Sequence, residues 1–201
     1  LAAGSFVVTG GKAEQIEDLG LAAQGLTSKP GGPLKNMKRP KVGIYKSWQA
    51  NMDEGWTRWI MEQYEFDIDT LHNAQIQRGS LKQYDAIILP SQAPSSILHG
   101  ASVQRTPEAY AGGIELSGAL ALESYVKGGG TLIAFDAASD FAIEQFGLPV
   151  RNVVGNASPE RFFIPGTLLR INVETEHPLA YGMAESTAAV FGRSRAFLGY
   201  D

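Results

Sequence analysis

The stretch from Thr131 to Gly147 holds the pattern with the clearest chemical meaning in this chain. An apolar strand pattern, TLIAFDA, follows three glycines and leads through a short turn into the helical pattern DFAIEQFG. Strand, tight turn and helix in this order form a nucleophile elbow, which lifts one side chain above the end of a parallel sheet. The turn offers Asp136, Ser139 and Asp140, and the chain contains no cysteine. A thiol nucleophile, a disulfide and a thiolate zinc site are therefore excluded.

Ser139 and His177 are the candidates for a catalytic pair. A serine nucleophile needs a base that removes its proton, and usually an acid that orients the base, for which Glu174 or Glu176 is available. The alternative for Ser139, shared with Asp140, is a helix N-cap. The alternative for His177 is a turn residue bonded to backbone. We favour these structural roles, so no catalytic residue is expected.

Five residues are candidates for ligand binding at the carboxyl edge of the predicted sheet. Ser47 and Trp48 follow the first strand pattern, Ser91 and Gln92 follow a later one, and Asp136 follows the strand of the elbow. Open α/β sheets bind ligands at this edge. The alternatives are ordinary loop polarity, with Trp48 covering the core, and an Asp136 carboxylate bonded to loop N–H groups. A metal or polar ligand at Asp136 stays open beside them.

Metal and phosphate sites are not indicated. The three histidines, His72, His99 and His177, lie far apart and show no paired ligand spacing. The glycines at 128–130 precede a strand rather than a helix, so they do not direct N–H groups at an anion. We expect no metal and no cofactor in this segment.

Composition narrows the class of protein further. The 201 residues carry a formal net charge of −4, and Lys and Arg are scattered apart from a small cluster between Lys35 and Lys41. This argues against nucleic-acid binding, which needs a basic face. No apolar run reaches the roughly 18 residues of a membrane span, so no membrane association is expected.

Strand and helix patterns alternate from Lys41 onward, which predicts a three-layer α/β fold with a mainly parallel sheet. The apolar runs at 41–46 and 85–90 are expected side by side in its centre. Trp56, Trp59, Ile60 and Tyr64 share one side of a predicted helix, and we expect that side, with both tryptophans, to face the core.

The chain is expected to divide at a segment rich in proline, glycine and basic residues. Residues 1–40 are interpreted as an N-terminal segment and linker from a longer parent chain, and residues 41–201 as one α/β domain. After Gly147 the pattern changes, and we expect an antiparallel or edge extension. The long loop at 91–113 is expected to pack over the carboxyl edge of the sheet or against a partner.

Two stretches resemble one specific group of proteins, namely DEGWTRWIMEQYEF and FDAASDFAIEQFGLPVRNV, with the more widely shared YDAIILP and HPLAYGM beside them. Over about residues 41–185 the chain resembles the C-terminal class I glutamine amidotransferase-like domain of bacterial zinc carboxypeptidase-like proteins of the carboxypeptidase A type. The resemblance implies a flavodoxin-like core, an extracellular or periplasmic parent and a peptidase domain upstream, which would hold the zinc.

The chain lacks the catalytic motifs of both amidotransferases and zinc carboxypeptidases. Working amidotransferases lift a cysteine at the elbow, and carboxypeptidases of this type carry a His-x-x-Glu zinc motif; neither is present here. We therefore expect a non-catalytic accessory domain of a zinc metallocarboxypeptidase-like hydrolase, with the upstream peptidase domain as its partner and a homodimer left open. The alternatives are a serine hydrolase using Ser139 with His177, and a small-molecule-binding module at the carboxyl sheet edge.

Overall fold

The computed structural model describes residues 5–18, 20, 23–192 and 194–200. The chain divides into two compact units, a larger one of Lys38–Leu168 with Val190–Asp201 and a smaller one of Leu1–Met37 with Leu169–Ala189. The expected division into a segment at 1–40 and one domain at 41–201 stays a prediction beside these two units. Parts of the expected 1–40 segment, residues 1–4, 19, 21 and 22, lie outside the described residues.

The larger unit is built on a parallel four-stranded sheet. Its strands are β1 (Lys41–Tyr45), β2 (Asp67–Leu71), β3 (Ala86–Leu89) and β4 (Thr131–Ala134), in the order β2-β1-β3-β4. Flavodoxin-like sheets begin with this order. The predicted flavodoxin-like α/β class and the predicted central pairing of the first and third strands are both confirmed.

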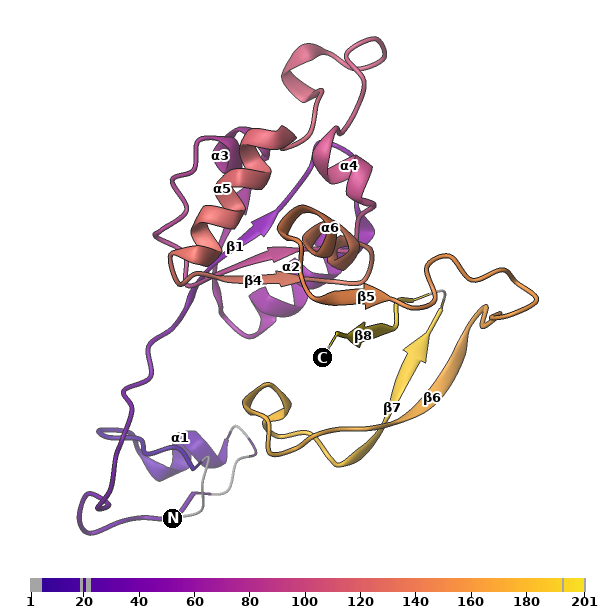
Figure 1. Ribbon diagram of the computed structural model, residues 1–201. Helices are drawn as coiled ribbons and strands as arrows, with labels where there is room; N and C mark the ends of the chain where they lie inside the picture. The colour runs from indigo at the N-terminus through magenta and orange to yellow at the C-terminus, as the bar shows by residue number, and fades with distance from the viewer. Residues whose placement is uncertain (1–4, 19, 21–22, 193, 201) are drawn as a thin grey trace. The chain divides into compact units, whose positions relative to one another are not determined.

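Four helices cover one face of this sheet, as Figure 1 shows. They are α3 (Asn73–Gln77), α4 (Pro94–Leu98), α5 (Glu115–Lys127) and α6 (Ala137–Phe146). Their inward side chains interlock with alternate residues of the strands and form the main core. Its fully buried members include Ile76, Ile87, Ile97, Leu122 and Phe141.

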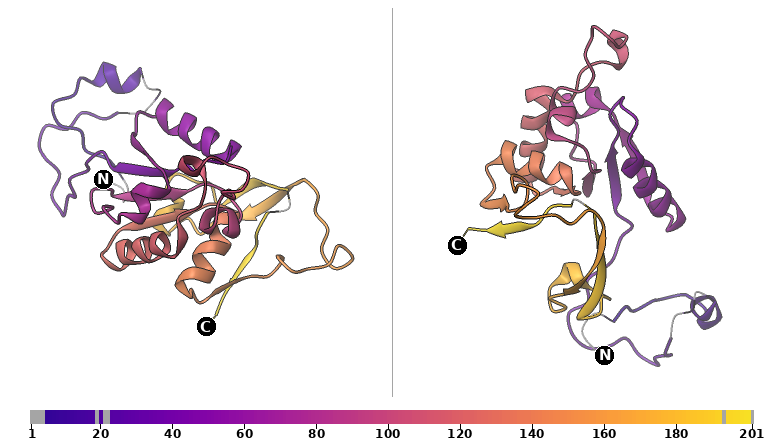
Figure 2. Two further views of the ribbon diagram at one scale, coloured as in Figure 1. Left: turned by 90° about the horizontal axis from the view of Figure 1, so that it is seen from above. Right: turned by 90° about the vertical axis from the view of Figure 1, so that its right-hand side faces the viewer.

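Helix α2 (Met52–Gln63) packs on the opposite face, against β1 and β2 (Figure 2). The core on this side is small. Val42, Ile44 and Ile88 are buried there, with Met61 and Ile68 packed against them. One face of the sheet therefore carries most of the apolar burial of this unit.

The apolar side of α2 faces solvent, so the prediction that Trp56 and Trp59 belong to the core was wrong. Their side chains are 59% and 52% exposed. The side of α2 that faces the sheet carries Glu54 and Arg58, whose ion pair spans 2.6 Å between Nη2 and Oε1. Satisfying these charges fixes which way the helix is turned, because a buried charge without a partner is costly.

The segment predicted as one long loop contains α4 and a short 3-10 helix, η1 (Glu108–Tyr110). Ile97 of α4 is fully buried in the main core, so the expectation of a continuous loop was wrong there. The excursion beyond it is closed at its base by a bridge between Ala101 and Gly112. Gly100 has φ +61°, and a Cβ there would lie 1.9 Å from the Gly112 carbonyl oxygen, so this position requires glycine.

The predicted antiparallel extension is present after α6. Strand β5 (Val150–Asn152) pairs antiparallel with β8 (Phe197–Gly199). Strands β6 (Thr167–Asn172) and β7 (Ser186–Phe191) form a second two-stranded sheet. The smaller unit also holds α1 (Ala13–Glu17) and the 3-10 helix η2 (Pro178–Ala180), and in it the ring of Phe6 meets Tyr181 edge-on.

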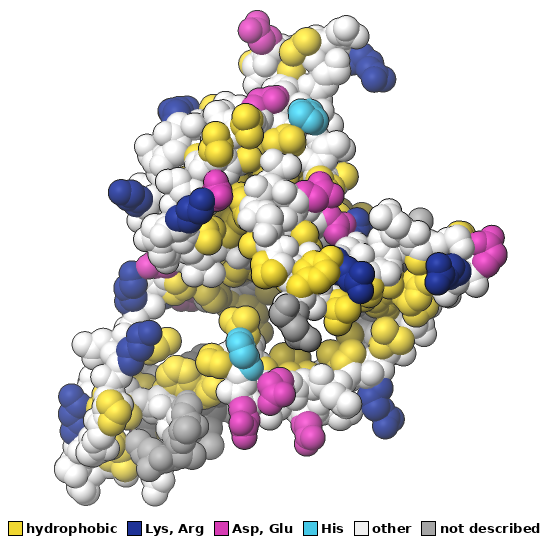
Figure 3. Space-filling view, viewed as in Figure 1, with side chains coloured by type: hydrophobic (Ala, Val, Ile, Leu, Met, Phe, Trp, Pro, Cys, Tyr) yellow, Lys and Arg dark blue, Asp and Glu magenta, His cyan; other side chains and the backbone are white. Residues whose placement is uncertain are grey.

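Surface chemistry agrees with the scattered basic residues of the sequence. On the face shown in Figure 3, Lys and Arg side chains are dispersed rather than gathered into one patch. Within the described part of the chain, no helix is both long enough and apolar enough to cross a membrane.

Candidate functional site

The elbow lies between the end of β4 at Ala134 and the start of α6 at Ala137. Asp136 occupies the N-cap position with φ +41° and ψ −108°. A non-glycine residue in such a conformation stores about 1–3 kcal/mol of strain, and such residues cluster at functional sites. The side chain that this turn lifts is therefore that of Asp136, rather than that of Ser139.

Ser139 lies inside α6, and its hydroxyl donates a 2.9 Å hydrogen bond to the carbonyl of Ala134. The prediction that Ser139 or Asp140 caps the helix was wrong, because Asp136 holds the N-cap position and makes no side-chain cap bond. The helix begins earlier than expected, since the backbone N–H of Ala138 already donates to the carbonyl of Phe135.

His177 belongs to the smaller unit, whereas Ser139 belongs to the larger one. The Nδ1 atom of His177 accepts a 3.2 Å hydrogen bond from the backbone N–H of Leu179, at the start of η2. Each member of the candidate catalytic pair thus has a backbone partner inside its own unit. The structure offers no observation that joins the two.

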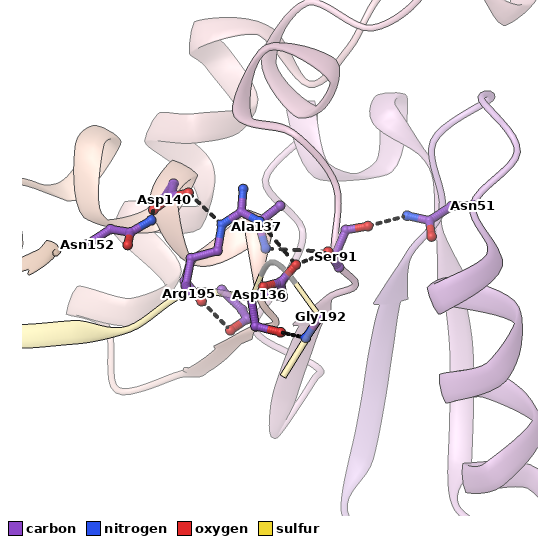
Figure 4. A network of polar contacts seen from close by, with 11 residues as sticks. Asn51, Ser91, Asp136, Ala137, Asp140, Asn152, Gly192 and Arg195 are labelled. Atoms are coloured by element: carbon purple, nitrogen blue, oxygen red, sulfur yellow. Dashed lines mark hydrogen bonds and ion pairs between the residues drawn. The ribbon is translucent and has the colours of Figure 1, made fainter. Parts of the chain in front are cut away.

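Asp136 is held by two side chains that converge on its carboxylate (Figure 4). The Ser91 hydroxyl donates to Oδ2 over 3.0 Å, and Arg195 Nη1 lies 3.3 Å from the same oxygen. Arg195 Nε donates to Asp140 Oδ2 over 2.9 Å, so the guanidinium bridges the two carboxylates. The other oxygen of Asp136, Oδ1, is buried and has no hydrogen-bond partner among the described residues.

Ser91 also links this carboxylate to the start of α2. Its carbonyl accepts a 3.0 Å hydrogen bond from the side chain of Asn51, which in turn caps α2 by accepting from the N–H groups of Asp53 and Glu54. Its hydroxyl lies 3.4 Å from the backbone nitrogen of Ala137. One network therefore connects the loops that follow β1, β3 and β4.

Ser47 and Gln92 meet at the same edge of the sheet. Gln92 Nε2 donates to the Ser47 hydroxyl over 3.0 Å, and this hydroxyl donates to the carbonyl of Gln49 over 3.1 Å. Both side chains thus connect the loop after β1 to the loop after β3. The structure brings Ser47 to Gln92 and Ser91 to Asp136, and it leaves their role in ligand binding as a prediction.

Trp48 has aromatic partners of its own. Its indole stacks on the His72 ring with centroids 3.9 Å apart and 8° between the planes, and it meets Tyr110 edge-on at 5.0 Å. Tyr110 belongs to η1, in the excursion between Ala101 and Gly112 of the segment 91–113. This contact agrees with the prediction that the excursion packs over residues at the carboxyl edge.

Arg195 is the member of this site that the sequence did not suggest. It lies 59 residues beyond Asp136, between β7 and β8, and an arginine in a short connection carries no local pattern that marks it. The pairing of β8 with β5 returns the chain to the elbow. Among the described residues, no group of three or more His, Asp or Glu side chains is placed to hold a metal ion. The expected absence of a metal stays a prediction.

No protein-family model matches the chain. No curated protein matches it either. Two solved structures are similar to it in part. A protein from Bacteroides uniformis described as ThuA-like is 18% identical with a TM-score of 0.47, over 83% of this chain. A protein from Thermoplasma acidophilum described as a GMP synthase subunit is 12% identical with a TM-score of 0.45, over 76% of this chain. The chain matches 64% of the length of each, and neither description names a peptidase.

Proposed function

We propose that this chain is a non-catalytic accessory module with a glutamine amidotransferase-like fold. The observation that supports the proposal is the residue at the elbow. In a working amidotransferase this position carries a thiol, whereas here it carries Asp136, whose carboxylate is paired with Arg195 and bonded to Ser91.

The chemistry of the elbow supports the same proposal. Hydrolysis of an amide through a covalent intermediate needs an activated nucleophile with a base in reach. A carboxylate whose charge is balanced by a guanidinium is poorly suited to that attack. Ser139 is no better placed, because its hydroxyl donates to a backbone carbonyl and none of its hydrogen bonds within the described part of the chain reaches a base.

The nature of the parent rests on the sequence resemblance over residues 41–185. We propose a zinc carboxypeptidase-like parent, extracellular or periplasmic, whose zinc belongs to an upstream peptidase domain. That domain is the proposed partner of this module in the same polypeptide. The module would position or stabilise it and bring no zinc ligand of its own.

Two measurements test the absence of catalysis. We expect the purified chain to hydrolyse neither glutamine nor simple esters above the buffer rate. The Ser139→Ala and Asp136→Asn variants should be indistinguishable from the unsubstituted chain. A hydrolytic rate that a folded Ser139→Ala variant loses would replace this proposal with the serine hydrolase. A rate that only Asp136→Asn loses would assign the chemistry to the elbow carboxylate.

The parent is tested separately. Expression of the full natural polypeptide should give peptidase activity that a chelator removes and added zinc restores. Removal of this module should leave the zinc chemistry intact and change stability or KM. A full polypeptide without any peptidase domain would contradict the parent and leave the elbow results unaffected.

A small-molecule-binding module is the second candidate function, and one atom favours it. Asp136 Oδ1 is buried and without a hydrogen-bond partner among the described residues, a state that usually costs free energy. A small ligand with a hydrogen-bond donor would satisfy this oxygen. Screening small amines and amides by ligand-observed NMR should then give binding that Asp136→Ala abolishes and the distant Asp69→Asn keeps. Equal binding to both variants would contradict it.

A further inference from the structure

The outer side of α2 carries a continuous apolar stripe. Its five residues, here called the α2 stripe, are Met52, Trp56, Trp59 and Ile60 of the helix, with Tyr64 at its C-cap. They recur at helical spacing on one side of the helix. Their exposed fractions are 76, 59, 52, 49 and 76%, and none of them carries a charge. Isolated exposed apolar residues are ordinary, but a grouped patch of this kind marks an interaction site.

The opposite side of α2 explains why the stripe cannot simply turn inward. Arg58 Nε donates to Glu54 Oε1 over 2.7 Å, and Lys46 Nζ lies 3.7 Å from Glu54 Oε2. Glu54 is buried, and Asn51 fixes the start of the helix. Rotation that buried the stripe would separate these charges or expose the small core beneath Met61. The stripe is therefore presented to solvent by a helix whose orientation is fixed.

The stripe has the properties of the centre of a protein interface. Trp56 and Trp59 meet edge to face, with ring centroids 5.8 Å apart and planes at 88°, so each indole restrains the other. Aromatic residues and methionine are enriched at interface centres and charged residues are depleted there. Restrained aromatic side chains also lose little conformational entropy when a partner covers them.

The exposed area of the stripe matches what a pair of identical helices needs. With side-chain areas of about 150–250 Å² for the large residues, the stripe exposes about 600 Å² per copy. Complete coverage of both stripes would bury at most about 1,200 Å², which reaches the lower end of the range for specific stable interfaces. Because one helix carries the whole stripe, a two-fold axis across it places the same residues opposite one another.

We propose that the chain forms a two-fold dimer in which the α2 stripes of two copies pack against each other. The argument for this interface uses neither the elbow nor a peptidase partner. A dimer would also bury the tryptophans that the small core beneath α2 leaves exposed.

The first experiment measures the mass of the full chain by sedimentation velocity between about 1 and 100 µM. We expect a concentration-dependent shift to twice the chain mass of 21.6 kDa. Trp56→Glu with Trp59→Glu should raise the dissociation constant at least tenfold. Leu116→Glu with Leu120→Glu on α5 is the matched control, because it places the same two charges at exposed apolar positions on the other side of the sheet. It should leave the dimer unchanged.

A second measurement keeps the proposal testable if the double variant misfolds. The chain has no cysteine, so Ile60→Cys and Leu116→Cys each supply one thiol. A short bismaleimide should join two copies through Cys at 60 and fail to do so at 116. A wild-type chain that stays monomeric at 100 µM overturns the proposal, and so does equal cross-linking at both positions. If the stripe instead binds an unlike protein, the chain stays monomeric in both experiments, and this result would also overturn the proposal.

Discussion

The two faces of the central sheet are covered very differently, although both are flanked by helices with apolar periodicity. On one face, α3 to α6 bury a large cluster that includes Ile97, Leu122 and Phe141 completely. On the other face, α2 buries three strand residues and leaves two tryptophans in solvent. Apolar spacing therefore shows which residues share a side of a helix, but it does not show which way that side faces. The charges on the opposite side of α2 decide this.

The largest expected effect is the difference in the free energy of unfolding between two substitutions of similar size, one on each face of the sheet. Leu122→Ala should lower the free energy of unfolding by about 2–5 kcal/mol, because it removes methyl groups from a fully buried site. Ile60→Ala on α2 should cost less than about 1 kcal/mol, because half of its side chain is already exposed. Urea denaturation at low micromolar protein keeps association out of the measurement. Similar losses for both variants would contradict the contrast between the faces.

The next effect concerns the ion pair beneath α2. Glu54→Ala should cost about 3 kcal/mol, because it leaves the largely buried guanidinium of Arg58 without its carboxylate. Glu62→Ala, at an exposed position of the same helix, should change the free energy of unfolding by no more than about 0.5 kcal/mol relative to the unsubstituted chain. Thermal and urea denaturation measure both. If Glu54→Ala also proves neutral, then the charges do not set the orientation of α2.

A smaller effect should appear at the elbow, where the main core meets the carboxyl edge. Asp136→Gly and Asp136→Ala both remove the ion pair with Arg195, but only glycine adopts a φ of +41° without strain. We expect the glycine variant to be more stable than the alanine variant by about 1 kcal/mol, as judged by urea denaturation. Equal stabilities would indicate that the turn relaxes once the carboxylate is gone.

The smallest effect concerns acid titration at the edge of the sheet. Hydrogen bonds from Lys41 and from Tyr84 lower the pKa of Asp69 below its ordinary value. A folded-state pKa below the unfolded value of about 4 gives stability that is present above that pH and is lost as the pH falls through the folded value. Asp69→Asn should therefore reduce the loss of stability on acidification below about pH 4. An unchanged pH profile would contradict this.

Much of the fold could be predicted because its main signals are local. The buried strands at 41–45 and 86–89 are short apolar runs, and their central pairing follows from their composition. The elbow was located for the same reason. The residue that the elbow lifts could not be identified, because strand β4 ends and α6 begins earlier than the capping residues Ser139 and Asp140 suggest. The contact of Arg195 with Asp136 depends on a strand pairing that no local pattern reveals.

The closed base of the excursion between Ala101 and Gly112 has a consequence for how this fold accepts change. The chain leaves and returns at one point, so apart from the contact of Tyr110 with Trp48, the length of the loop between is nearly uncoupled from the sheet. Doubling the length of such a loop costs only about 0.6 kcal/mol in closure entropy. A foreign peptide inserted near Gln104 should therefore be displayed without unfolding the core. The same tolerance would let this stretch diverge in length among relatives while Gly100 at its base stays glycine.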